Sequence, residues 1–201
     1  MTIEHDNLLE LSYEDLANAL YRKGLLDGYK KITDKTKWRE AVTAEKLGHT
    51  AHKAISAGKY SEKYGSDAYD EKNVIFAEYK TQAIEDPQLR NLLEKTKNKN
   101  KGTKFVPLVV NGVYNGAYTE DAILDYSKID HYFAVFYRER CCLIIKPKTE
   151  EVIRQLSCGL NKMNENRKLG KKVTTNCNSV TISLKNTDLY TIVHKDYSTI
   201  Q

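Results

Sequence analysis

Hydrophobic residues recur along this chain with two periods, one typical of helices and the other typical of strands. Helical spacing predicts helices in the opening third of the chain, including 38–56, and again at 87–93, 119–126 and 149–163. Short apolar runs predict strands at 74–77, 105–110, 131–137 and 141–145, and residues 173–193 alternate as one hairpin or two short strands do. Because helices and strands are interspersed, the pattern predicts an α/β fold with a mixed central sheet and helices on both sides.

The length and composition fit one domain covering residues 1–201. With 3 prolines and 10 glycines, the chain is neither collagen-like nor of low complexity. No uncharged apolar stretch approaches the roughly 20 residues that span a bilayer, and residues 1–10 lack the apolar core of a secretory signal. The 4 cysteines include no Cys-x-x-Cys pair, which favours reduced thiols, two of them packed as small hydrophobic residues. We therefore expect a cytoplasmic protein without a membrane partner.

The stretch most informative about chemistry joins Asp67 to Glu78 and Lys80 through a predicted hairpin. Asp67 precedes a turn at 70–73, and Glu78 follows the apolar strand that comes next. Folding the hairpin back brings the two carboxylates side by side. The two-residue period of a strand then puts Glu78 and Lys80 on one face and Tyr79 on the other. Two carboxylates and one ammonium group are expected at one spot.

A divalent cation fits such a spot, because two adjacent carboxylates repel each other unless a cation neutralises them. Mg²⁺ binds one or two carboxylates together with water and substrate phosphate. It polarises a phosphoryl oxygen and activates a water molecule, and a neighbouring lysine can orient that water or stabilise developing negative charge. The residues thus outline a site of phosphodiester hydrolysis. The alternative is an ordinary exposed ion pair at a strand end, which contributes little to stability.

An acid-x-lysine triplet occurs twice in this part of the chain, as residues 70–72 and as residues 78–80. Only the second triplet follows an apolar strand and has an acid, Asp67, at a suitable distance upstream. The second triplet is therefore the candidate, and the first is a turn.

Residues 65–67 and 74–80, read together as Gly-Ser-Asp … Val-Ile-Phe-Ala-Glu-Tyr-Lys, resemble the PD-(D/E)xK nuclease motif, which many type II restriction endonucleases carry. The later stretch 130–136 resembles the core strand that often follows in those enzymes. Ser66 stands where the family has proline, at a variable position that carries no ligand. The resemblance covers about 38–146 and implies a restriction-endonuclease-like mixed central β-sheet flanked by helices.

The resemblance implies that Asp67 and Glu78 bind Mg²⁺ and that Lys80 assists the nucleophilic water. It also implies a role for Glu45, because these enzymes often place a further acid on a preceding helix. Glu45 lies on the apolar face of the predicted 38–56 helix, and a buried acid needs a partner. That partner is a metal-bound water or Lys80, or else the nearby His49 in a purely structural role.

Double-stranded DNA is the substrate that the resemblance implies, and the net charge of +5 permits such a partner. Gln82 shares the strand face of Lys80 and is a candidate contact to the scissile phosphate region. The lysine-rich stretch between the catalytic strand and the next one supplies further DNA-binding candidates, namely Lys97, Lys99, Lys101 and Lys104. Symmetric cutting of both strands predicts a homodimer, and we assign 147–201 to recognition or dimerisation.

Two other functions stay open on the sequence alone. A nuclease with the same motif could act in DNA repair or recombination rather than restriction. A non-catalytic DNA-binding module would carry the same acids without using them.

Other groupings of reactive residues are weaker. Glu45, His49 and His52 fall on one face of the predicted helix, but zinc usually needs a further strong ligand. Cysteines have no pattern that pairs them with His131 as a nucleophile. Gly112 and Gly116 lack the spacing of a phosphate-binding loop, so we interpret them as turn residues.

Overall fold

The computed structural model describes residues 35–51, 66–85, 88, 109–115, 117, 119–171 and 177–197. The helices expected before residue 35, most of the 87–93 helix and the start of the 105–110 strand lie outside the described residues. In chain order the elements are α2 (Lys35–Leu47), β1 (Thr50–Ala51), β2 (Ala68–Asp70), β3 (Ile75–Ile84), β4 (Val109–Asn115), α4 (Glu120–Tyr126), β5 (Asp130–Tyr137), β6 (Arg140–Pro147), α5 (Thr149–Lys168), β7 (Cys177–Ser183), the 3₁₀ helix η4 (Thr187–Leu189) and β8 (Tyr190–Lys195).

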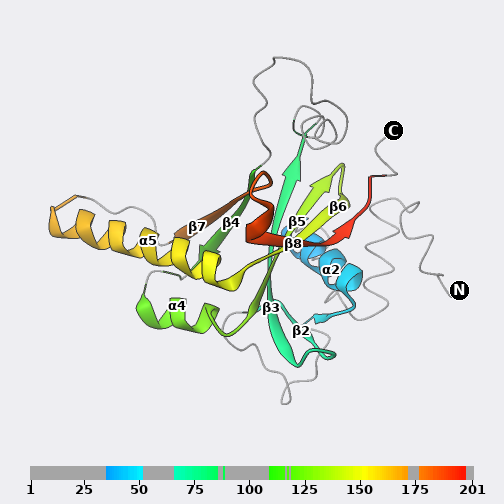
Figure 1. Ribbon diagram of the computed structural model, residues 1–201, viewed down its shortest axis with the longest axis horizontal. Helices are drawn as coiled ribbons and strands as arrows, with labels where there is room; N and C mark the ends of the chain where they lie inside the picture. The colour runs from blue at the N-terminus through cyan, green and yellow to red at the C-terminus, as the bar shows by residue number, and fades with distance from the viewer. Residues whose placement is uncertain are drawn as a thin grey trace, which may run out of the picture.

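Six strands form the central sheet in the order β1-β2-β3-β5-β6-β8 (Figure 1). β3 and β5 run parallel, with Glu78 beside His131 and Lys80 beside Phe133, while the other neighbouring pairs are antiparallel. β4 and β7 form a separate two-stranded antiparallel ribbon. The predicted mixed α/β fold is therefore confirmed at the level of class.

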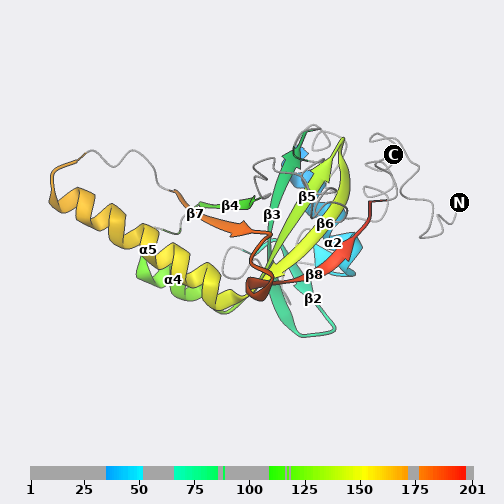
Figure 2. The same ribbon diagram turned by 45° about the horizontal axis from the view of Figure 1, so that its top comes forward.

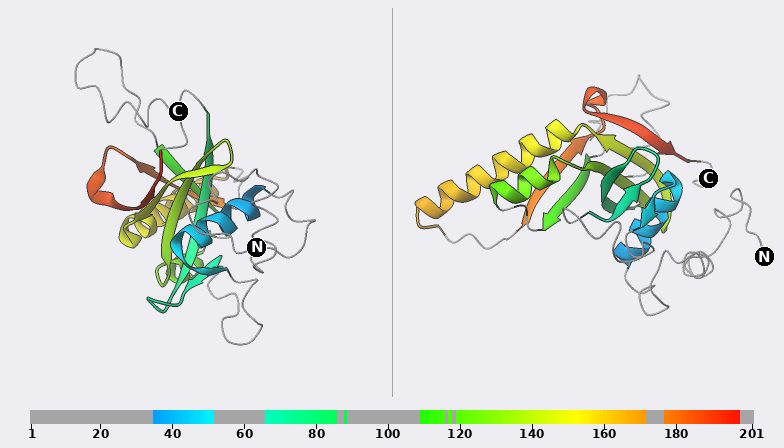
Figure 3. Two further views of the ribbon diagram at one scale, coloured as in Figure 1. Left: turned by 90° about the vertical axis from the view of Figure 1, so that its right-hand side faces the viewer. Right: turned by 90° about the horizontal axis from the view of Figure 1, so that it is seen from below.

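The central sheet separates two hydrophobic clusters. On one face α2 packs its buried residues, Trp38 among them, against Phe136 and Ile144. On the other face α4, α5 and the β4–β7 ribbon enclose a second cluster (Figures 2 and 3). The adjacent Cys141 and Cys142 enter opposite clusters, as strand geometry requires, and both are reduced and buried. Helices on both sides and packed thiols agree with the sequence.

Helix α2 ends at Leu47 and not near residue 56, which corrects the prediction. Gly48 follows with φ +69°, a left-handed conformation that glycine adopts without strain and that commonly terminates helices. The chain then enters β1. His49 consequently lies beyond the helix and does not share a helical face with Glu45.

The two strands that follow α5 belong to different sheets. α5 continues to Lys168, beyond the predicted end at residue 163, and its last turn contains Arg167 and Lys168, whose charges favour a helix C-terminus. The alternating stretch 173–193 forms two strands, β7 and β8, which pair with β4 and β6 and not with each other. The described parts of this region, residues 147–171 and 177–197, thus pack onto the two sheets.

Helix α4 begins as predicted, with the Thr119 side chain accepting a hydrogen bond from the backbone N–H of Ala122. Among the helices that the structure describes, none is long and apolar enough to cross a membrane.

Candidate functional site

The β2–β3 hairpin forms where the sequence predicts it. Asp70 closes the turn, because its Oδ1 accepts hydrogen bonds from the backbone N–H groups of Lys72 and Asn73 at 3.0 and 3.1 Å. The Asn73 side chain donates to Oδ2 of Asp70 at 2.6 Å. The resulting register pairs Ala68 with Ala77.

Asp67 lies next to Glu78 where this hairpin begins. It directly precedes β2, and its negative charge contributes to the raised pKa of Glu78, so the two carboxylates are neighbours. The N–H of Asp67 donates to the carbonyl of Ala77 at 2.9 Å, and its Oδ2 accepts from the N–H of Tyr79 at 2.9 Å. The fold therefore brings together the two carboxylates that the sequence predicts.

Lys80 joins them from the same strand face. Its Nζ donates to Oε1 of Glu78, and the side chains of Lys80 and Glu78 are only 15% and 5% exposed. Among the described residues, Oε2 of Glu78 has no hydrogen-bond partner, although it is buried. A buried carboxylate oxygen without a partner is costly. A cation bound there would remove that cost.

The acidity of Glu78 reflects this environment. Burial, followed by the negative charge of Asp67, raises the pKa of the Glu78 carboxyl to about 8, while Lys80 opposes the shift. A raised pKa in a carboxylate pair marks a site that favours an additional positive charge, whether a proton or a cation.

We expect the metal-free protein to lose stability as the pH rises from about 4.5 to about 8. In that window the folded state keeps a proton on Glu78 that the unfolded chain has released, so the stability present below pH 4.5 is lost as Glu78 ionises. The Glu78→Gln variant should lack this loss, which amounts to a few kcal/mol. Urea unfolding across the pH range, in the presence of a chelator, measures it. An unchanged pH slope in the variant would exclude Glu78 as its source.

Strand β4 covers Lys80 closely. A Cβ atom at Gly112 would lie 2.7 Å from Cγ of Lys80 and 2.9 Å from the Phe133 ring. Gln82 holds β4 in place, because its Oε1 accepts from the N–H of Asn111 at 2.9 Å. The interpretation of Gly112 as a turn residue is therefore wrong, and Gly116 lies outside the described residues. Gly112 sits inside a strand, and the absence of a side chain makes room for the stem of Lys80.

The Gly112→Ala variant is expected to be less stable than the wild type by about 1–3 kcal/mol, the usual cost of overpacking a tight site. Urea denaturation measures the difference. Val113→Ala is the matched control, since Val113 is the next residue and is 51% exposed. Equal stability of Gly112→Ala and the control would contradict the close approach of β4 to Lys80.

Glu40 is the acid of helix α2 whose charge acts on Glu78. Its negative charge contributes to the raised pKa of both Glu78 and Tyr79. Glu45, predicted for this role, is half-buried near the C-terminal end of α2. The sequence pattern places an acid on the correct helix, but Glu40 is the one coupled to the carboxylate pair.

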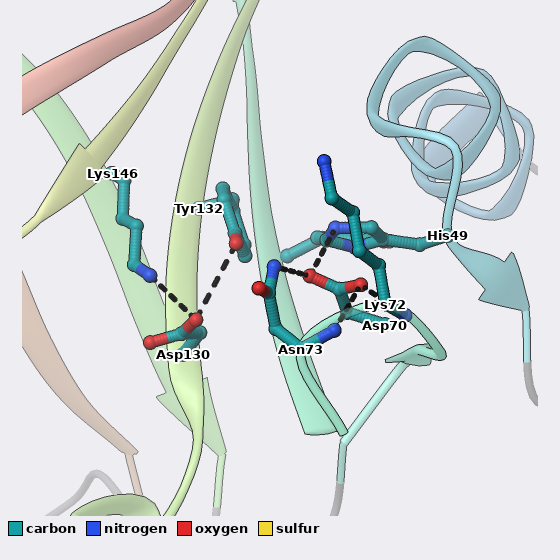
Figure 4. Close-up of polar contacts among 8 residues, drawn as sticks. His49, Asp70, Lys72, Asn73, Asp130, Tyr132 and Lys146 are labelled. Atoms are coloured by element: carbon teal, nitrogen blue, oxygen red, sulfur yellow. Dashed lines mark hydrogen bonds and ion pairs between the residues drawn. The ribbon is translucent and has the colours of Figure 1, made fainter. Parts of the chain in front are cut away.

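A second polar cluster occupies the opposite face of the sheet (Figure 4). Nε2 of His49 lies 3.5 Å from Oδ2 of Asp70, and Nδ1 of His49 lies 2.8 Å from the hydroxyl of Tyr79. Close by, Lys146 donates to Asp130 at 2.6 Å. His49 thereby holds Tyr79 on this face. Because successive side chains of a strand alternate, the neighbours Glu78 and Lys80 point to the other face.

The predicted DNA contacts divide into two groups. Gln82 is half-buried and bound to β4. The four lysines Lys97, Lys99, Lys101 and Lys104 lie outside the described residues, as does His52.

No group of three or more His, Cys, Asp or Glu side chains within the described ranges could hold a metal ion. No protein-family model matches the chain, and no curated protein is significantly similar to it.

Sequence reasoning missed three residues of the site. They are Glu40, Gly112 and Tyr114, whose ring lies against Lys80. The period-two alternation of Val110, Gly112 and Tyr114 is the signal that could have extended the predicted strand beyond residue 110.

Proposed function

We propose that the protein is a Mg²⁺-dependent endonuclease of the PD-(D/E)xK class that hydrolyses phosphodiester bonds of double-stranded DNA. One observation carries the proposal. Glu78 and Lys80 are paired on one face of β3 with the charge of Asp67 beside them, and a buried carboxylate oxygen of Glu78 has no partner among the described residues.

Asp67 and Glu78 are the residues that would hold the cation, since hard divalent ions prefer carboxylate oxygens. A bound Mg²⁺ supplies Lewis-acid polarisation of the phosphate and a more acidic water. The contribution of the chain is to keep the two carboxylates adjacent and partly desolvated. Glu40, from α2, is the further acid proposed to act on this pair, because its negative charge contributes to the raised pKa of Glu78. The role predicted for Glu45 stays a prediction.

Lys80 contributes a positive charge beside the carboxylates. An ammonium group in this position orients the attacking water and stabilises negative charge that develops on the phosphoryl oxygens. Its stem is confined by Gly112, so the ammonium group is already placed before substrate binds.

At the finer level we propose a type II restriction endonuclease that acts as a homodimer in the cytoplasm. Gln82 and the lysines Lys97, Lys99, Lys101 and Lys104 are the proposed DNA contacts, and a two-fold dimer would present two sites to a palindrome. Light scattering with and without cognate duplex decides between a dimer and a monomer.

Incubation with plasmid DNA and Mg²⁺, followed by sequencing of the fragment ends, tests the proposal. Discrete fragments that share a short end sequence are expected. Cutting confined to branches or ends would favour repair or recombination. DNA binding without any hydrolysis would favour a non-catalytic module and contradict the nuclease assignment.

A further inference from the structure

The ammonium group of Lys80 has two neighbours, the Glu78 carboxylate and an aromatic ring. Nζ of Lys80 lies 4.5 Å from the centroid of the Tyr114 ring. The face of such a ring carries the negative end of a quadrupole and attracts a cation, more strongly when water is excluded. Here Tyr114 is fully buried, and the Lys80 side chain is 15% exposed.

The Tyr114 ring is itself fixed by a buried histidine. Nε2 of His131 lies 2.9 Å from the carbonyl oxygen of Tyr126, which can only accept, so the hydrogen of the neutral ring is on Nε2. Nδ1 is then an acceptor, and the Tyr114 hydroxyl donates to it at 3.0 Å. Burial lowers the pKa of His131 to about 4 and so preserves this arrangement at neutral pH.

The backbone reinforces the contact at a second point. Gly112 and Tyr114 occupy the same face of β4, two residues apart, and both touch the space that Lys80 fills. Gly112 confines the stem of Lys80, and Tyr114 faces its charged end. His131 pairs with Glu78 across β3 and β5, so the histidine that orients Tyr114 is anchored beside the carboxylate.

We propose that Tyr114, fixed by His131, is a positioning residue that holds the ammonium group of Lys80 beside the Asp67–Glu78 carboxylate pair. The inference rests on the proposed nuclease function. A cation bound to Glu78 shares the carboxylate with Lys80 and so weakens the ion pair between Glu78 and Lys80. The Tyr114 ring then keeps Lys80 at the site.

A shape-matched pair of variants tests the role of the ring charge. Tyr114→Phe keeps the ring and loses the hydroxyl, and it is compared with a variant that carries trifluorinated phenylalanine at the same position. The fluorines weaken the negative face and change the shape little. We expect kcat of the fluorinated variant to be about 10-fold lower than kcat of Tyr114→Phe, with KM unchanged. A loss of this size is what removal of a partly buried cation–π contact implies. Equal kcat values would overturn the proposal.

A second readout needs no nuclease activity. In the metal-free protein, acylation of Lys80 by an amine-reactive ester, followed by mass spectrometry, reports how tightly its amine is held. The fluorinated variant should react several-fold faster than Tyr114→Phe at Lys80 and equally at Lys128, an exposed internal reference. Tyr126→Phe is the matched control, because Tyr126 packs on Tyr114 and donates to Asn115.

The two arms separate the two claims. A wild-type protein that cleaves no DNA contradicts the nuclease function, while faster acylation in the fluorinated variant still supports the positioning of Lys80. Active enzyme with unchanged acylation and unchanged kcat in that variant overturns the positioning role alone. An increase in Lys80 acylation in Tyr126→Phe as large as that in the fluorinated variant would also overturn it, because the effect would then be general loosening.

Discussion

Replacement of Glu78 by glutamine is expected to abolish DNA cleavage while leaving DNA binding in place. The amide has nearly the same size, but it lacks the negative charge that would bind a cation and that pairs with Lys80. Loss of a metal ligand removes several kcal/mol of transition-state stabilisation, which corresponds to a fall of about 1,000-fold or more in the cleavage rate. Single-turnover rates at saturating protein measure it.

The same hairpin supplies the matched control. Glu71 belongs to the turn triplet and is exposed, with a hydrogen bond from Thr50 at 3.1 Å. Glu71→Gln removes one carboxylate from the same hairpin and is expected to cleave at the wild-type rate. Equal rates for Glu78→Gln and Glu71→Gln would remove Glu78 from the site.

Lys80→Met is the second change with a large expected effect. Methionine retains an unbranched, flexible side chain that can lie against Gly112 and the Tyr114 ring, but it removes the ammonium group. The charge that develops on the phosphoryl oxygens then loses the ammonium group of Lys80, and cleavage is expected to fall about 100-fold or more. Cleavage rates at saturating Mg²⁺ and protein measure the loss.

Lys72→Met is the control for this change, because Lys72 is the exposed lysine of the turn triplet. Filter binding or fluorescence anisotropy on the same duplex, with Ca²⁺ in place of Mg²⁺, separates binding from catalysis. Lys80→Met should bind DNA nearly as the wild type does. A parallel loss of binding and cleavage would make Lys80 a DNA contact and not a catalytic residue.

The hairpin is predictable because its determinants are local. Asp70 and Asn73 define the turn, and the apolar run after Val74 defines the strand, so register and face follow from adjacent residues. The start of α4 at the Thr119 cap is equally local. So is the placement of Cys141 and Cys142 on opposite faces of the sheet. These features follow from neighbouring residues alone.

The remaining features of the site depend on contacts between distant segments. The ring of Tyr114 meets Lys80 from a strand of the separate ribbon, and its hydroxyl meets His131 17 residues away. A glycine in this sequence pattern fits a turn as well as a strand. The close approach of Lys80, which requires a glycine within the strand, is visible only in the structure. The sequence predicts Glu45 because it lies on the apolar stripe of a helix expected to reach residue 56. The helix instead ends before Gly48, which is left-handed.

The central claim is that Asp67, Glu78 and Lys80 form one metal-dependent site of phosphodiester hydrolysis. The most direct measurement is the single-turnover cleavage of one DNA fragment across a range of Mg²⁺ concentrations, by the wild type and by Glu78→Gln. We expect a wild-type rate that rises with Mg²⁺, saturates and vanishes with a chelator, and no cleavage by the variant. Cleavage that persists in the chelator, or equal rates for the two proteins, would contradict it.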